Sequence, residues 1–113
     1  MELTETRLDA AVAVAVKGRV DSTTAWMLGD KLASLVHGGN PRVVVDFKDV
    51  DYISSAGFRT LLIAKKLCEH AGGELALCGV GGEVLRLFGI AAFTELFRIF
   101  AGREDAAAAI KPK

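Results

Sequence analysis

The chain has little cysteine and no net charge, and both features narrow the range of ligands and partners that we expect for it. Its two cysteines, Cys68 and Cys78, do not belong to a metal-ligand spacing such as C-x-x-C. Each lies inside an apolar run, which favours buried free thiols over a disulfide. The 14 basic and 14 acidic residues balance, which argues against broad electrostatic capture of nucleic acid. We therefore expect no metal, no cofactor and no direct nucleic-acid partner.

Long hydrophobic segments are also missing. No apolar run approaches the ~20 residues that span a bilayer. The opening sequence MELTETRLD lacks the basic and apolar segments of a signal peptide. These absences predict a cytoplasmic protein without a membrane span. The 113 residues fit a single domain, 1–113, with a short frayed tail from about Lys111.

The apolar residues that are present follow two alternating patterns. Val- and Leu-rich runs predict buried strands at residues 10–16, 42–47 and 74–78, with the more polar segment 2–8 paired to the first through a turn near Asp9. Helical spacing marks residues 25–36, 58–68, 84–88 and 104–110, and a short strand-like piece falls within 94–100. This alternation predicts an α/β fold: a mostly parallel core sheet with an antiparallel N-terminal edge strand, flanked by about four helices.

The stretch DFKDVDYISSAGFRTLL, residues 46–62, is the most informative part of the chain. A buried strand runs into a polar loop, and Ser54 and Ser55 stand directly before a helix. A phosphate on a serine there would meet unpaired backbone N–H groups and the positive end of the helix dipole. The same placement is typical of a serine that only caps the helix. Spacing alone leaves both interpretations open.

The segment DYISSAGFRTLL resembles the signature loop of the STAS family, named for sulphate transporters and anti-sigma factor antagonists. Other pieces follow in the family's order, among them GRVD at 18–21, RVVVD at 42–46, GGEL at 72–75 and VLRLF at 84–88. In the bacterial antagonists of the family, this loop usually reads Asp-Ser-Ser-Gly or Asp-Ser-Thr-Gly, and the first hydroxyl after the aspartate is phosphorylated. Setting Gly57 on the family's glycine places Ser55 on that hydroxyl. Ser54 then replaces the usual aspartate, and Ala56 occupies the second hydroxyl position. Asp49 and Asp51 keep the neighbourhood acidic.

The resemblance implies a bacterial anti-sigma factor antagonist that acts by partner switching. Such a protein binds an anti-sigma factor serine kinase, is released when the kinase phosphorylates it, and is reset by a phosphatase. The chain is then a substrate and a ligand, not an enzyme, and a monomer or weak dimer. The residues expected to contact the partner are Asp21, Ser54, Gly57, Phe58 and Arg59.

Each of these residues also has a plainer interpretation. Asp21, with Ser22 and Thr23, could cap the first helix, Arg59 could be a solvated surface residue, and Phe58 could belong to the core. Trp26 and Met27 lie beside the apolar stripe of the first helix, so that one of them could be exposed for a partner.

Two other functions fit the same fold. One is a subunit of a lipid-transport ABC system that binds the ATPase, a complex that phosphorylation would not affect. The other is a small-molecule or nucleotide-binding sensor, which would need a defined pocket.

Overall fold

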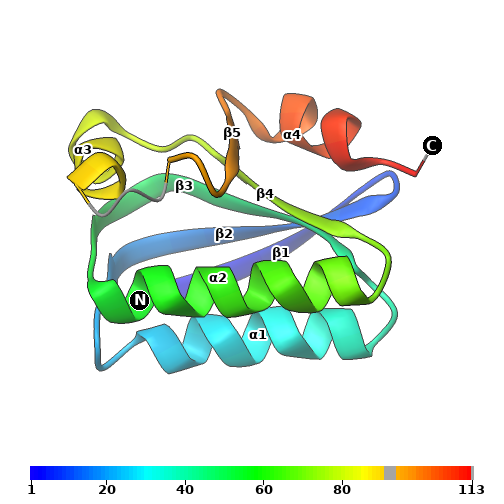
Figure 1. Cartoon of the computed structure of the whole chain (residues 1–113), viewed down its shortest axis with the longest axis horizontal. Coiled ribbons are helices and arrows are strands. Elements are labelled where there is room, and N and C mark those ends of the chain that lie inside the picture. The colour runs from blue at the N-terminus through cyan, green and yellow to red at the C-terminus, as the bar shows by residue number, and fades with distance from the viewer. Residues whose placement is uncertain (91–93, 113) are drawn as a thin grey trace.

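The computed structural model of the protein describes residues 1–90 and 94–112. Two layers of helices enclose a mixed sheet whose strands lie in the order β1-β2-β3-β4-β5 (Figure 1). The elements in chain order are β1 (Glu2–Leu8), β2 (Ala11–Val20), α1 (Ala25–His37), β3 (Arg42–Ile53), α2 (Ser55–His70), β4 (Glu74–Cys78), α3 (Gly82–Ile90), β5 (Arg98–Phe100) and α4 (Arg103–Ile110).

The strand directions confirm the predicted α/β architecture. β1 pairs antiparallel with β2 through a turn at Asp9, whose φ of 54° places it in the left-handed region. The pairs β2–β3, β3–β4 and β4–β5 are all parallel. None of the helices in residues 1–90 and 94–112 is long and apolar enough to cross a membrane.

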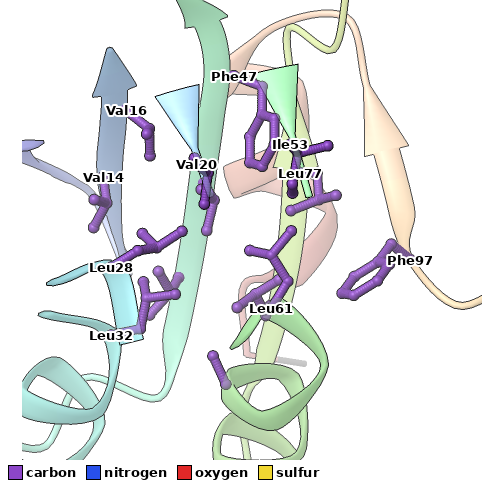
Figure 2. Close-up of a cluster of buried hydrophobic side chains, with 14 of the residues drawn as sticks. Val14, Val16, Val20, Leu28, Leu32, Phe47, Ile53, Leu61, Leu77 and Phe97 are labelled. Carbon is purple, nitrogen blue, oxygen red and sulfur yellow. The ribbon is translucent and has the colours of Figure 1, made fainter. Parts of the chain in front are cut away.

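The two faces of the sheet carry side chains of different size, because alternate residues of a strand point to opposite sides. Branched aliphatic residues such as Val14, Val45 and Leu77 face α1 and α2 and form the larger core. Figure 2 shows several of these side chains converging with Leu28, Leu32 and Leu61 from the two helices. This core fixes α1 and α2 side by side along one face (Figure 1).

The opposite face is built mostly from small residues. Ala13, Val44, Ala76 and Cys78 pack beneath α4 in a separate, smaller cluster. Because these side chains are short, an eight-residue helix is enough to cover them. The tail predicted from Lys111 is exposed at Lys111 and Pro112, and Lys113 lies outside the described residues.

The second and third strands are longer than the sequence predicts. We expected them to end at Val16 and Phe47, followed by a polar loop, but they continue to Val20 and Ile53. The two strands stay paired through register shifts between Ala15 and Lys17 and between Gly18 and Arg19. The alternation of exposed Asp49 and Asp51 with buried Val50 and half-buried Tyr52 is a strand pattern that the high polarity of the segment obscures.

Candidate functional site

Two turns meet at the edge of the sheet where parallel strands β2 and β3 end. Val20, the last residue of β2, is paired with Ile53, the last residue of β3. The Ser54 N–H donates to the Val20 carbonyl oxygen at 2.9 Å, so the β2–α1 turn is tied to the β3–α2 turn. The structure therefore brings Asp21 close to Ser54, two residues that lie far apart in the sequence. This edge is also where open α/β sheets place their functional sites.

The adjacent serines have different environments. Ser54 is the N-cap of α2, and its Oγ accepts a long hydrogen bond, 3.4 Å, from the Gly57 N–H. Ser55 is the first residue of the helix; it is exposed, and its hydroxyl has no hydrogen-bond partner among the described residues. The capping interpretation thus applies to Ser54. Ser55 is left with a free, solvent-facing hydroxyl.

Gly57 and Phe58 lie on the inner side of the same turn. A Cβ at Gly57 would approach Ile53 Cγ1 to 2.6 Å and Val20 Cγ1 to 2.9 Å, distances that only glycine avoids. Phe58 is 5% exposed, and its ring packs edge-on against Phe88 with 4.8 Å between centroids. Both residues hold α2 against the sheet. That they contact a partner stays a prediction.

Asp21 organises the other turn through hydrogen bonds. Its Oδ1 accepts from the Thr23 hydroxyl at 2.7 Å and from the Thr23 N–H at 2.9 Å. These bonds, first the one from the hydroxyl, lower the pKa of the Asp21 carboxyl from its ordinary value of 3.8. The helix itself begins later: its N-cap is Thr24, without a side-chain cap bond. The prediction that a side chain of residues 21–23 caps α1 is therefore wrong.

Three residues that shape this edge, Arg19, Thr24 and Tyr52, are not predicted to do so by the sequence. The Thr24 hydroxyl donates to the Arg19 carbonyl oxygen at 2.8 Å and accepts from the Asp21 N–H at 2.9 Å. The Arg19 guanidinium lies 4.4 Å from the centroid of the Tyr52 ring, and its Nε is 3.8 Å from Asp21 Oδ2. Arg19 and Tyr52 are register partners on β2 and β3. Only the unexpected length of the two strands brings them together.

Two further residues are exposed near the start of the helices. Arg59 lies one turn into α2, and Trp26 lies at the start of α1 with 64% of its surface exposed. The Trp26 Nε1–H donates to the Thr23 carbonyl oxygen at 3.1 Å, which fixes the ring beside the Asp21 turn. Met27 is only half-buried. The prediction that either Trp26 or Met27 is exposed is therefore confirmed for Trp26. That Trp26 contacts a partner stays a prediction.

A cavity of about 410 Å³ lies on the side of the sheet that α4 covers. Asp46, at its wall, accepts from Arg103 Nη2 at 2.8 Å and from Arg103 Nε at 3.2 Å. Burial, followed by the nearby Asp46 carboxylate, raises the pKa of the neighbouring Cys78 thiol to about 12. The sensor alternative needs a pocket of this kind. Because Asp46 and Arg103 neutralise each other, however, this pair presents no unpaired charge to a ligand.

The sequence and the order of its helices and strands match a known family. The model of the STAS domain matches residues 3–106, and the chain belongs to this family. A Bordetella bronchiseptica protein, BtrV, is 40% identical over 111 residues, which is 98% of this chain and 96% of that protein. Its name describes it as an anti-sigma factor antagonist. The anti-sigma-B factor antagonist of Bacillus subtilis is 30% identical over 94 residues, covering 82% of this chain and 84% of that protein.

Solved structures show the same fold at low sequence identity. A Thermotoga maritima protein whose name describes an anti-sigma factor antagonist superposes with a TM-score of 0.88 at 16% identity, covering 96% of this chain and 93% of that chain. The Bacillus cell fate determinant SpoIIAA, solved in its phosphorylated form, gives a TM-score of 0.73 at 14% identity, covering 96% of this chain and 98% of that chain.

Proposed function

We propose that this protein is an anti-sigma factor antagonist that acts by partner switching through Ser55. In its unmodified form it binds an anti-sigma factor that is also a serine kinase, and so frees a sigma factor. The kinase transfers the γ-phosphoryl group of ATP to Ser55 Oγ; the hydroxyl proton leaves with a base of the kinase, and ADP departs. A phosphatase later hydrolyses the phosphoserine. The names of the two sequence relatives support the antagonist role.

One observation carries the choice of residue. Of the two adjacent serines, only Ser55 has an exposed hydroxyl that takes no part in capping α2. A kinase can reach that hydroxyl without disturbing the helix. The phosphate would also stand at the positive end of the helix dipole, which stabilises an anion. Phosphorylation would therefore change the surface charge while leaving the domain folded.

The modification acts on the partner through charge. Phosphorylation adds about 1.5 to 2 negative charges at neutral pH. Within a desolvated contact, that charge must lose its water or meet an unmatched group, and each ~1.4 kcal/mol lost weakens binding tenfold. The partner surface that we propose lies around Ser55 and comprises the exposed Arg59 and Trp26 with the half-buried Asp21 and Ser54. Gly57 and Phe58 hold these residues in place. We expect a monomer or weak dimer in the cytoplasm.

The direct test incubates the protein with host lysate and ATP and maps phosphopeptides by mass spectrometry. We expect stoichiometric phosphate on Ser55 and none in the Ser55→Ala variant. Ser54→Asp is the matched control: aspartate also caps helices well and stands where the family usually has it, so this variant should still be phosphorylated. The proposal would be overturned if Ser55 stayed unphosphorylated in a lysate that phosphorylates an established kinase substrate.

A second measurement separates partner switching from the transporter-subunit alternative. The partner captured by the unmodified protein is tested again with protein that carries phosphoserine at residue 55. Partner switching requires the affinity to fall at least tenfold. Equal binding of the two forms would instead favour a constitutive subunit, such as one bound to a transporter ATPase.

A further inference from the structure

Arg59 differs from the other arginines of the chain. All seven arginines lie within the described residues. Six of them have a hydrogen-bond or ion-pair partner: Arg7 with Asn40, Arg19 with Asp21, Arg42 with the Gly72 carbonyl, Arg86 with Glu83, Arg98 with Glu74 and Arg103 with Asp46. Arg59 is exposed and has no such partner among residues 1–90 and 94–112. Its guanidinium is thus a free cation beside the candidate phosphorylation site.

The helix places Arg59 on the same surface as Ser55. The two residues are four positions apart in α2, which brings them to one side of the helix on successive turns. Ser55, Arg59, Ile63, Lys66 and His70 form a continuous exposed stripe, while the opposite side of α2 faces the core. Side chains in a helix lean toward its N-terminus, so the Arg59 side chain extends in the direction of Ser55.

The sequence of α2 gives Arg59 no carboxylate to pair with. From Ser55 to Cys68 the helix contains no acidic residue; the first is Glu69, which pairs with Lys65 at 2.6 Å. In the neighbouring turn, the Asp21 carboxylate already accepts from Thr23 and lies near Arg19. A phosphate on Ser55 would be the first anion within one turn of Arg59 on its own helix.

We propose that Arg59 binds the phosphate of phosphorylated Ser55 and so becomes a part of the switch. This inference rests on the proposed function for the presence of the phosphate. The anion stands N-terminal to the cation at the i, i+4 spacing, the more favourable order in a helix. A guanidinium also donates two parallel N–H bonds to phosphate oxygens. Phosphorylation would then add negative charge and, in the same event, withdraw the positive charge of Arg59 from the partner surface.

The pairing is tested on protein in which phosphoserine is incorporated at residue 55 during translation, so that no kinase is needed. The phosphate is titrated by ³¹P NMR. Because a nearby cation stabilises the dianion, its second pKa should rise in Arg59→Ala by about 0.3 units relative to the unsubstituted chain. Arg59→Lys keeps a cation at this position, so the second pKa of the phosphate should stay partly lowered. Lys66→Ala removes a charge from the same stripe at roughly 16 Å from Ser55 along the helix axis, and it should leave the phosphate pKa unchanged.

Thermal unfolding supplies an independent readout. The change in Tm caused by Arg59→Ala is measured with serine and with phosphoserine at residue 55, and the phosphorylated form should lose about 2 °C more. Equal phosphate pKa values in the unsubstituted and Arg59→Ala proteins, together with equal losses of Tm, would overturn the inference. That failure is separate from a failure of the proposed function, which appears as an unmodified Ser55 in lysate.

Discussion

The two faces of the sheet bury side chains in different ways. On one face, Val14, Val45 and Leu77 interlock with two helices of 13 and 16 residues. On the other, Ala13, Ala76 and Cys78 lie beneath an eight-residue helix beside a polar cavity. Large side chains need much helical surface to cover them, whereas alanines leave little to cover. The first face therefore anchors the helix that carries Ser55, and the second contributes less to stability.

Truncating one buried side chain on each face to alanine should give the largest difference in the free energy of unfolding. Leu61→Ala empties space beneath α2 in the larger core, where Leu61 is fully buried, and we expect it to lower the free energy of unfolding by ~3–4 kcal/mol. Ile110→Ala, at the end of α4, should cost only ~2 kcal/mol, because a terminal helix can adjust to the lost volume. Urea denaturation of the two variants measures both values. Equal losses would contradict the difference between the faces.

The ion pair between Asp46 and Arg103 is the second place to test the small face. Arg103→Met leaves the 8% exposed Asp46 without its cation, and we expect a loss of ~2–3 kcal/mol. Adding Asp46→Asn removes the uncompensated charge while keeping an oxygen for the Lys48 N–H, so the double variant should recover part of that loss. If the double variant were less stable than Arg103→Met, desolvation of Asp46 would not be the cause.

Each face of the sheet contains one free cysteine. The labelling rates of the two thiols therefore compare how readily local unfolding exposes each face. Cys68 lies on the buried side of α2, whereas Cys78, at the end of β4, lies beneath α4. Burial raises the pKa of the Cys68 thiol from 9.0 to about 11, and that of Cys78 to about 12. In native protein at pH 8, a thiol reagent should label Cys78 at least tenfold faster than Cys68, because local release of α4 exposes only Cys78. Equal rates would mean that both faces open together.

The same thiols predict the direction of a pH effect. Because their pKa values are raised on folding, their contribution to stability is complete below about pH 9 and is lost as the pH rises through about 11 and 12. Replacing both with alanine should flatten the alkaline part of the stability curve. Denaturation between pH 8 and pH 11 tests this, and an unchanged slope would refute it.

The smallest effect is expected at the start of α2. Ser54→Ala removes the cap and should cost ~1 kcal/mol, whereas Ser55→Ala should change stability by less than ~0.5 kcal/mol. The comparison shows whether the two serines divide capping and modification between them. Thermal unfolding of the two variants and of Ser54→Asp, which should retain most of the stability, provides the measurement.

Much of this architecture follows from local patterns in the sequence. The runs VVV and AVAV predict strands buried on both sides, and the periodic Leu28, Leu32 and Leu35 predict α1. The ends of β2 and β3 could not be predicted in this way. Lys48, Asp49 and Asp51 are polar residues typical of a loop, and they are held in a strand because β2 continues alongside them. Such pairing depends on a partner about 30 residues away, which no short window of sequence contains.

By itself the sequence determined the family, the order of strands and helices, and the two serines of the signature segment. It did not distinguish their roles, since both are small hydroxyl residues at a helix start. The tertiary structure decided that Ser54 caps α2 and Ser55 faces solvent, because the Ser54 N–H is bound to the Val20 carbonyl and fixes where the helix begins. Among the described residues it also leaves Arg59 without a hydrogen-bond or ion-pair partner, a property that depends on the positions of the neighbouring carboxylates.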